Sequence, residues 1–256
     1  MTARVVILRG RTSDRTADGV GGAAALGAAV AERLGVGAVV IGEPGSPREA
    51  QWREDLRDAR ATLEAAAVTV AVTRRPLLTA TDCSICVGTT PAVARRWPDA
   101  WLLWLDAHGD FNTPDTTPSG FLGGMCLAGA VGLWDTGYGS GPGPERVVLV
   151  GGRDLDDAEE ELMARHGVVR TDDPAAALAG REVFVHLDVD ILDPTVMPGQ
   201  LYPAPGGLDT TQLRDLLADV AAQARIVGAE ITCFSTPELS GVLAQAAAPL
   251  LESPAP

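Results

Sequence analysis

Short, continuously apolar segments alternate with longer amphipathic or alanine-rich segments along this chain, and this alternation constrains its fold more than any other feature. Strands that are buried on both faces carry such uninterrupted runs of Val, Ile and Leu. We therefore predict an α/β fold with a mostly parallel, doubly wound sheet of about eight strands and helices on both faces. The expected strands are 4–8, 38–41, 68–73, 101–105, 146–151, 167–170, 182–188 and 225–231. The expected helices are 22–34, 46–66, 90–97, 155–165, 209–224 and 237–251.

The length and the charge of the chain limit what it can be. Its 256 residues are enough for one large α/β domain with a sizeable core. No linker divides them, so residues 1–256 are expected to form a single domain. The formal net charge is -14, from 34 acidic and 20 basic residues. Nucleic acids and anionic membranes attract basic surfaces, so neither is an expected partner.

Targeting segments and disulfides are not expected either. The amino terminus shows no secretory signal, and no apolar run reaches the roughly 20 residues that a membrane helix needs. The chain has 4 cysteines, which are too few for a disulfide scaffold in a chain of this length. We therefore expect a protein of the reducing cytoplasm.

Two segments rich in Pro and Gly, 111–124 and 191–209, interrupt the alternation of strands and helices. Each of them follows a predicted strand, so each is expected to form a loop. In open α/β sheets the ligand crevice lies beyond the carboxyl ends of the strands. These two loops therefore mark the place where a functional site is expected.

Acidic and imidazole side chains gather where the same two strands end. They are Asp106, His108 and Asp110 in the first segment, and His186, Asp188, Asp190 and Asp193 in the second. Most of them occupy alternate positions, which share one side of the chain if the strand geometry continues. We therefore expect about six ionisable groups at one edge of the sheet.

Carboxylates in such a cluster raise one another's pKa unless a cation neutralises them. For a single segment, helix caps and exposed loop acids are the common alternative. Two such segments together favour a divalent metal, and the mixture of carboxylate and imidazole suits Mn²⁺, with Zn²⁺, Fe²⁺ and Co²⁺ as rivals. The number of carboxylates indicates a pair of metals roughly 3.5–4 Å apart. Such a centre activates water for attack on an electrophilic carbon, and a nearby carboxylate can protonate the leaving amine.

These segments resemble the signature motifs of the arginase (ureohydrolase) family. The motifs here are "DAHGD" at 106–110 and "DVDILDP" at 188–194, and the likeness extends through "GGRDLDD" at 151–157 to a late strand bearing Glu230. The resemblance implies a three-layer α/β/α sandwich, two Mn²⁺ ions and hydrolysis of a guanidino or amidino carbon in a small substrate. Many members are trimers or hexamers, so a homo-oligomer is expected, with a monomer as the alternative.

The segment "ATDCS" at 80–84 departs from the family pattern Gly-Gly-Asp-His-Ser, in which the His binds manganese. Cys83 stands in the place of that His. The resemblance implies two ligand sets: Cys83, Asp106, Asp110 and Asp188 for one metal, and Asp106, His108, Asp188 and Asp190 for the other. A thiolate is a softer ligand than an imidazole and suits Mn²⁺ less well. Weak binding, a different metal and the loss of one of the two ions are therefore all open.

His186 and Cys86 each allow more than one interpretation. His186 stands where many relatives carry a small residue, and it is a replacement ligand, a donor that orients a carboxylate ligand, or a structural His at a strand end. Cys83 and Cys86 form a Cys-x-x-Cys pattern that also suits a redox pair. We favour a metal ligand for Cys83 and a small core residue for Cys86. Cys126 and Cys233 form no second pair in the sequence, so a four-cysteine zinc site is not expected.

The loop "FNTPDTTPSGFLGG" predicts which substrate is bound. Phe121 and Gly123 stand where typical arginases have an Asn and a His beside the substrate, so the usual proton shuttle is missing. The resemblance nevertheless assigns residues to an amino-acid substrate: Asn112, Thr117 and Ser119 for its α-carboxylate, Asp156 for its α-amino group and Glu230 for its guanidinium. Asp110 and Glu230 are the predicted catalytic carboxylates.

This combination resembles a divergent branch of the family that hydrolyses N-hydroxy-L-arginine to L-ornithine and hydroxyurea in antibiotic biosynthesis of the D-cycloserine type. A hydroxyguanidine is far less basic than a guanidine, so it enters a site in the neutral form and needs less help from a shuttle histidine. An arginase or another guanidino or formimino hydrolase is the first alternative. A catalytically weak or non-catalytic metal-binding relative is the second, although the survival of the acids argues against it.

Overall fold

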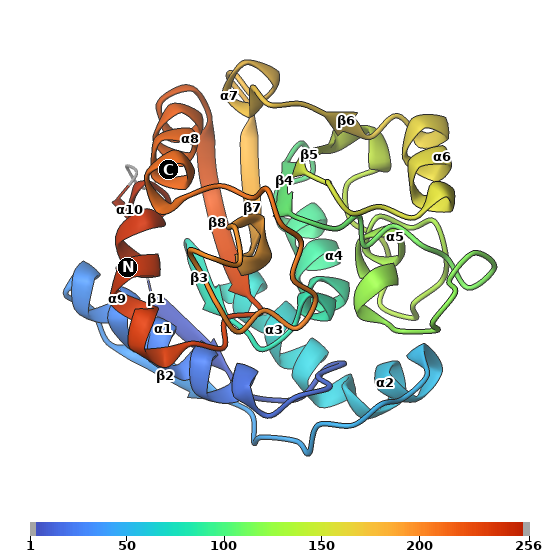
Figure 1. Ribbon diagram of the computed structural model, residues 1–256, viewed down its shortest axis with the longest axis horizontal. Coiled ribbons are helices and arrows are strands. Elements are labelled where there is room, and N and C mark those ends of the chain that lie inside the picture. Colours follow the sequence, from blue (N-terminus) through green and yellow to red (C-terminus); the bar gives the residue numbers. More distant parts are fainter. Residues whose placement is uncertain (1–3, 253–256) are drawn as a thin grey trace.

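The computed structural model describes residues 4–252. Its strands are β1 (Arg4–Leu8), β2 (Ala38–Ile41), β3 (Pro76–Thr79), β4 (Trp101–Asp106), β5 (Val147–Gly151), β6 (Val169–Arg170), β7 (Glu182–Asp188) and β8 (Arg225–Thr232). They form one sheet of 8 strands in the order β2-β1-β3-β8-β7-β4-β5-β6 (Figure 1). All neighbouring strands in this sheet are parallel.

The helices cover both faces of this sheet. They are α1 (Asp18–Leu34), α2 (Trp52–Asp58), α3 (Arg60–Val72), α4 (Cys86–Arg96), α5 (Cys126–Ala130), α6 (Asp157–His166), α7 (Pro174–Ala177), α8 (Thr210–Gln223), α9 (Ser240–Ala246) and α10 (Ala248–Glu252). One apolar cluster joins the sheet to α1, α7, α8, α9 and α10, and a second joins its other face to α3, α4, α5 and α6. Figure 1 shows α1, α8 and α9 on one side of the strands and α4 and α5 on the other. The predicted three-layer α/β/α fold is confirmed.

One predicted strand, 68–73, is wrong, because this segment continues helix α3 to Val72. Val68 and Val72 are 59% and 67% exposed, whereas Val70 is fully buried together with Leu63 and Ala66. That burial follows the spacing of a helix rather than the alternation of a strand. β-branched residues lower helix propensity by only a few tenths of a kcal/mol each, so the preceding alanine-rich turns carry the helix through them. The strand in this part of the chain is instead β3, which begins at Pro76, after the end of α3.

The middle of the sheet positions the functional groups. β3, β8, β7 and β4 are neighbours, and the register pairs His186 on β7 with both Trp104 on β4 and Glu230 on β8. Paired residues of adjacent strands point to the same face, so these three side chains form one row across the sheet. Two residues further along the same strands, Asp188 is paired with Thr232 at the ends of β7 and β8.

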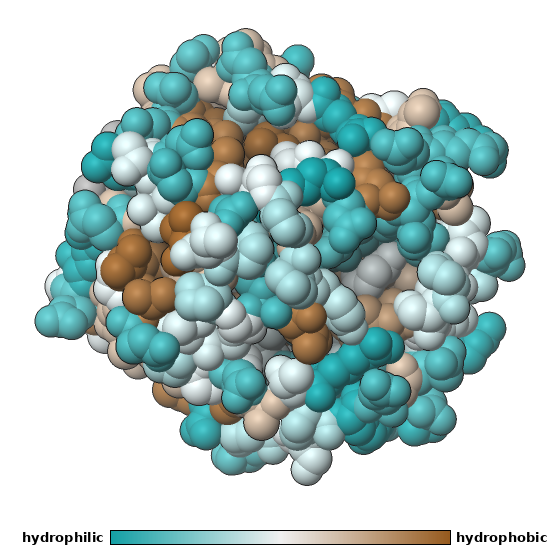
Figure 2. Space-filling model, in the orientation of Figure 1, coloured by the Kyte–Doolittle hydropathy of each residue, from teal (hydrophilic) through white to brown (hydrophobic). Residues whose placement is uncertain are grey.

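The surface in the view of Figure 2 is mostly hydrophilic, with hydrophobic residues in separate patches. The segment that links β7 to α8 crosses the middle of this view, over the ends of the central strands (Figure 1). Between residues 4 and 252, no helix is both long enough and apolar enough to span a membrane.

Alanine substitutions in α3 test its assignment as a helix. We expect Val70→Ala to lower the free energy of unfolding by about 1–3 kcal/mol, because it removes fully buried methyl groups. Val72→Ala should change it by less than about 0.5 kcal/mol, because Val72 is exposed and alanine favours a helix. Urea denaturation of both variants measures the difference. Equal losses would indicate a strand in which both side chains share a buried face.

Candidate metal centre and substrate pocket

The ends of β4 and β7 bring two acids together at one edge of the sheet. β4 ends at Asp106 and β7 at Asp188, and only 1% and 4% of these residues are exposed. Each is close enough to Asp190 for its charge to raise their pKa values. Parallel strands place their carboxyl ends along a common edge, which is why acids far apart in the sequence meet here.

Asp106, His108 and Asp190 form the first group of possible ligands, whose nitrogen and oxygen atoms all lie within 4.8 Å of one another. His108 Nδ1 lies 2.9 Å from Asp190 Oδ2 and 3.5 Å from Asp106 Oδ1. Backbone amides fix both carboxylates, because the amide of His108 donates to Asp106 and the amide of Ala107 donates to Asp190. This group therefore offers two oxygens and one imidazole nitrogen in fixed positions.

Turns, rather than continued strands, direct several of these side chains. β4 ends at Asp106, so His108 and Asp110 lie on the turn that follows it, and Asp190 lies in the short 3₁₀ helix Val189–Ile191. The strand alternation used to predict that these side chains meet ends before His108, Asp110 and Asp190, so it does not explain why they do. Asp110 has a φ of 50°, a left-handed conformation that is uncommon outside glycine. Within residues 4–252, Asp110 belongs to no group of three ligand atoms this close together, so its metal contact stays a prediction.

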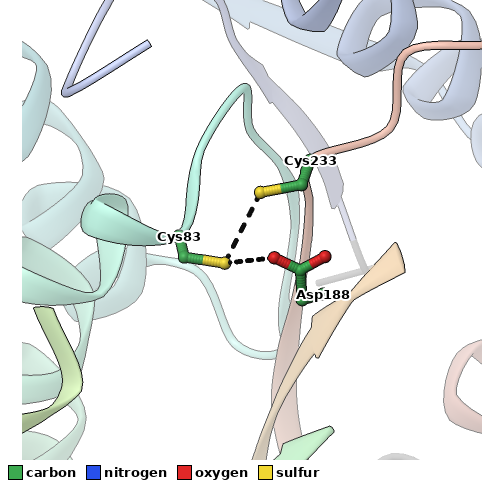
Figure 3. Close-up of side chains that lie close together, drawn as sticks. All are labelled: Cys83, Asp188 and Cys233. Carbon is green, nitrogen blue, oxygen red and sulfur yellow. Dashed lines mark hydrogen bonds between the residues drawn. The ribbon is translucent and has the colours of Figure 1, made fainter. Parts of the chain in front are cut away.

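Cys83 approaches the centre from the opposite side. Asp82 follows β3 and caps the 3₁₀ helix Cys83–Ile85 by accepting a hydrogen bond from the amide of Ser84. This turn directs the Cys83 thiol toward Asp188, with Sγ 2.7 Å from Oδ2 (Figure 3). The predicted neighbourhood of Cys83 and Asp188 is therefore present, and whether both bind the same metal stays a prediction.

His186 lies beneath Cys83 and connects it to Glu230. Its Nε2 is 3.1 Å from Cys83 Sγ, and its Nδ1 is 2.7 Å from Glu230 Oε1. The imidazole stacks on the indole of Trp104 with ring centroids 3.5 Å apart and planes 3° from parallel. His186 thus contacts the Cys83 thiol, which none of the three interpretations of the sequence specified. With Cys83 and Asp106 it also forms a group of possible ligand atoms within 4.8 Å of one another, so its role stays a prediction.

Glu230 is placed differently from the prediction that it contacts the guanidinium. The residue is fully buried, one of its oxygens accepts from His186, and the other has no hydrogen-bond partner within residues 4–252. It is not among the residues that line the two pockets at this edge of the sheet. His186 lies between Glu230 and Cys83, so the Glu230 carboxylate contacts the centre through that imidazole, and its contact with a guanidinium stays a prediction.

Burial sets the charges of the centre. Burial, together with the charges of neighbouring acids, raises the pKa of Asp106 and of Asp110 well above its usual range and that of Asp188 to about 7. Burial acts to lower the pKa of His108, but its hydrogen bonds to Asp106 and Asp190 outweigh this and raise the pKa to about 12. One imidazolium cannot balance four buried carboxylates. The residues present therefore fit a site for divalent cations.

A substrate pocket adjoins this cluster and contains most of the predicted binding residues. Its lining includes His108 and Asp110 together with all four predicted contacts to an amino acid, Asn112, Thr117, Ser119 and Asp156. Asn112 donates through Nδ2 to Asp156 Oδ2 at 2.9 Å, so the groups predicted to meet the α-carboxylate and the α-amino group are adjacent. Their roles remain predictions, but the structure brings them together.

Phe121 and Tyr202 separate this pocket from a second one that reaches Cys83 and Asp188, and they line both. The guanidinium of Arg15 stacks over the Phe121 ring at 4.1 Å and donates to the Tyr202 hydroxyl at 2.9 Å. A Cβ atom at Gly123 would lie 2.4 Å from the Phe121 ring. The ring therefore occupies the space that a side chain at position 123 would need.

Two residues of this crevice, Arg15 and Cys233, were not predicted. Arg15 lies in the loop that follows β1, and Cys233 directly follows β8. The rule that loops after parallel strands line the crevice applies to both segments and was the signal that could have found them. The sulfur of Cys233 lies 3.6 Å from that of Cys83. The Cys-x-x-Cys spacing suggested Cys86 as the neighbour of Cys83 and gave no sign of Cys233.

These features define an α/β protein of the doubly wound class with a candidate centre for divalent cations at the carboxyl edge of its sheet. Comparison with known sequences makes the assignment narrower. The chain belongs to the arginase family, whose model matches residues 53–253. It is thus a ureohydrolase, a hydrolase of C–N bonds in linear amidines, from a family that typically uses two manganese ions and small guanidino substrates.

Individual relatives agree with this family. The chain is 39% identical to the N(omega)-hydroxy-L-arginine amidinohydrolase of Streptomyces lavendulae, over 98% of this chain and 96% of the relative. It is 36% identical to an arginase of Bacillus caldovelox over 67% of each chain. The solved native structure of arginase from Bacillus caldovelox matches with a TM-score of 0.83 at 27% identity, covering 99% of both chains.

The buried acids predict a stability that depends on pH and on metal. The pKa of Asp188 is raised from 3.8 to about 7, so the folded state binds this proton more tightly than the unfolded state. The metal-free protein should lose stability as the pH rises from about 4 through 7. A cation at about 100 times its Kd should restore about 2.7 kcal/mol, or about 5–10 °C in Tm, and the gain should be larger at pH 7.5 than at pH 5.

Thermal unfolding with and without MnCl₂ at both pH values measures this effect. Asp188→Asn should reduce the pH dependence, leaving the part due to Asp106 and Asp110, and should abolish most of the gain from Mn²⁺. Asp215→Asn, at an exposed carboxylate on α8, should retain both. An equal gain from Mn²⁺ in the two variants would contradict the assignment of Asp188 to the centre.

Proposed function

We propose that this enzyme hydrolyses N-hydroxy-L-arginine to L-ornithine and hydroxyurea. The observation that carries the proposal is the Phe121 ring in the space beside Gly123, next to the four residues predicted to contact the α-carboxylate and α-amino group of an amino acid. The similarity over nearly the whole chain to an enzyme named for this substrate supports it. A substrate of this kind needs amino-acid recognition but not the missing histidine.

The amino-acid end of the substrate would bind in the pocket lined by Asn112, Thr117, Ser119 and Asp156. The amide and hydroxyl groups would donate to the α-carboxylate, and the Asp156 carboxylate would accept from the α-ammonium. The hydrogen bond from Asn112 to Asp156 holds the two halves of this recognition in one arrangement. The guanidino end would then point toward Asp110 and His108, which line the same pocket.

Asp106, His108, Asp188 and Asp190 are the proposed ligands of one cation, and Cys83, Asp106, Asp110 and Asp188 those of the other. When bound, divalent cations of this kind supply Lewis acidity that makes water nucleophilic near neutral pH. The contacts within the centre support the grouping of Asp106 with His108 and Asp190, and of Cys83 with Asp188.

In the proposed reaction, the oxygen of water bonds to the guanidino carbon, and the bond from that carbon to the chain nitrogen breaks. The chain nitrogen gains a proton and leaves as the side-chain amine of ornithine. Asp110 is the proposed carrier of that proton, because it lines both pockets and therefore borders the path between substrate and centre. Glu230 would act through His186, as a positioning residue for Cys83, rather than by touching the substrate.

The neutral form of the substrate suits this crevice. A guanidinium must lose a proton before water can attack its carbon readily, and arginases are expected to need a base beside the substrate for such proton movements. Here the apolar face of Phe121 replaces that base. A hydroxyguanidine is much less basic, so a larger fraction enters already neutral. The conventional arginase activity is the second candidate, because the same amino-acid contacts fit arginine.

A direct comparison of the two substrates tests the proposal. Purified enzyme supplied with Mn²⁺ should release ornithine from N-hydroxy-L-arginine with a kcat/KM at least tenfold that for L-arginine. Ornithine, urea and hydroxyurea are quantified separately. His166→Ala, at an exposed position on α6, serves as a matched control and should match the parent. Faster cleavage of arginine would overturn the proposal, and no cleavage of either would favour a non-catalytic relative.

The double variant Phe121→Asn with Gly123→His tests the role of the ring. Gly123→His alone must push the Phe121 ring aside, because a Cβ there lies 2.4 Å from it. Removing the ring in the double variant frees that space, so we expect the double variant to raise the ratio of arginine to N-hydroxy-arginine kcat/KM above the ratio of either single variant. An unchanged ratio would show that this position does not set the substrate preference.

A further inference from the structure

Cys233 stands at the metal centre although no motif of the sequence placed it there. It directly follows β8, and its φ of 61° puts it in the left-handed region, which costs a non-glycine residue free energy. Cys83, Asp188 and Cys233 point toward one another from three separate segments (Figure 3). Their two sulfurs and a carboxylate oxygen lie within 4.8 Å of one another.

These three residues are exposed to the crevice on one side. All three line the pocket that also contains Asp110 and Tyr202. Cys83 is further fixed from below, because Thr232 Oγ1 and His186 Nε2 each lie 3.1 Å from its sulfur. Hydrogen bonds from the protein therefore fix the donor atoms of the cluster on one side, and its other side faces the pocket.

The donor atoms differ from those of the group around His108. Asp106, His108 and Asp190 offer oxygen and imidazole nitrogen, which suit Mn²⁺. Cys83 and Cys233 offer two sulfurs beside one carboxylate, and thiolates select softer ions such as Zn²⁺ or Co²⁺. The two halves of the centre are thus chemically unlike.

We propose that Cys233 is a metal ligand, and that Cys83, Cys233 and Asp188 together bind a thiophilic divalent cation while Asp106, His108 and Asp190 hold Mn²⁺. In this arrangement Cys233 takes the place of Asp106 and Asp110 in the ligand set proposed above for the cation at Cys83. The inference rests on the proposed function only for the location of the centre. Three protein ligands with a fourth position open to the crevice is the pattern of a catalytic rather than a structural zinc site. Binding would release the thiol protons to solvent, since the thiolate is the ligand.

The distances are compatible with a tetrahedral ion. Two Zn–S bonds of about 2.3 Å at a tetrahedral angle place their sulfurs about 3.8 Å apart, and the sulfurs of Cys83 and Cys233 are 3.6 Å apart. A Zn–S and a Zn–O bond would separate sulfur and oxygen by about 3.5 Å. Cys83 Sγ and Asp188 Oδ2 are now 2.7 Å apart in a hydrogen bond, so the carboxylate has to move outward on binding.

A disulfide between the same two cysteines is the competing use of this geometry. Its sulfurs would have to approach to about 2.05 Å, and both ligands would then be lost. Thiol content therefore distinguishes the two: in protein that has met no reductant, a metal site gives two titratable thiols once an anaerobic chelator removes the metal, whereas a disulfide removes two.

Cobalt substitution of the full-length protein tests the inference without measuring activity. Chelator-treated, reduced protein is first supplied with one equivalent of Mn²⁺ and then titrated with Co²⁺. We expect a thiolate-to-cobalt charge-transfer band in the near ultraviolet that saturates at one equivalent. Its intensity per cobalt should fall by about half in Cys233→Ser and in Cys83→Ser, and the band should vanish in the double variant. Cys86→Ala, which removes the other cysteine of the Cys-x-x-Cys pattern, should retain the full band.

Competition adds a second measure. Zn²⁺ should displace the cobalt, and the apparent Kd for Zn²⁺ should rise at least tenfold in Cys233→Ser. Cys233→Gly provides a variant that adopts a positive φ without strain and should show the same loss, so a folding defect of the serine variant does not decide the result. A parent spectrum without the band, a band unchanged in both Cys233 variants, or two missing thiols in metal-free protein that has met no reductant would each overturn the inference.

The outcome is separable from the proposed reaction. Hydrolysis of N-hydroxy-L-arginine with Mn²⁺ alone and no cobalt band would retain the function and reject the thiolate site. A cobalt band that requires Cys233, together with no cleavage of either substrate, would retain the site and reject the function.

Discussion

The burial of several carboxylates at one edge of the sheet is the constraint on which the rest of this structure depends. Moving an ion from water into a protein interior costs several kcal/mol unless it is paired. Burial raises the pKa values of Asp106 and Asp110, and only Asp190 gains enough from His108 to have its pKa lowered. The apolar clusters on both faces of the sheet contribute favourable free energy of folding that offsets the cost of burying these carboxylates. A divalent cation is the group that best relieves the repulsion, so binding and stability are coupled.

An imidazole lies behind Cys83, the cysteine predicted to stand in the place of the family's ligand histidine. A thiol is shorter than an imidazole, and here the imidazole of His186 lies directly behind it, 3.1 Å away. That imidazole is held in turn by Glu230 and by the face of Trp104. The row Trp104, His186 and Glu230 thus follows from strand register, and it places Glu230 behind the imidazole that contacts Cys83.

The sequence was sufficient for the layer architecture and for most of the acids, because both depend on local patterns. Uninterrupted apolar runs located seven of the eight strands to within a few residues, and only 68–73 failed, where β-branched residues lie within a helix. The meeting of Cys83 with Cys233 could not be predicted, because it depends on β3 and β8 being neighbours and on a positive φ at Cys233. The withdrawal of Glu230 behind His186 likewise depends on which residues are paired across strands. Long-range pairing has no signature in a single sequence.

The two predicted departures from the family pattern, Cys83 and the pair Phe121 and Gly123, line one crevice, and the proposed substrate would account for both. Thiolates donate more charge to a metal than imidazole does, which weakens its action as a Lewis acid. Phe121 beside Gly123 leaves no base at the place where one assists a charged guanidinium. Each change would slow hydrolysis of arginine, because its strongly basic guanidino group stays protonated and its carbon is then less readily attacked by water. A hydroxyguanidine enters neutral and needs less of either kind of help, so the soft ligand and the apolar ring are consistent with selection for the same, less basic substrate.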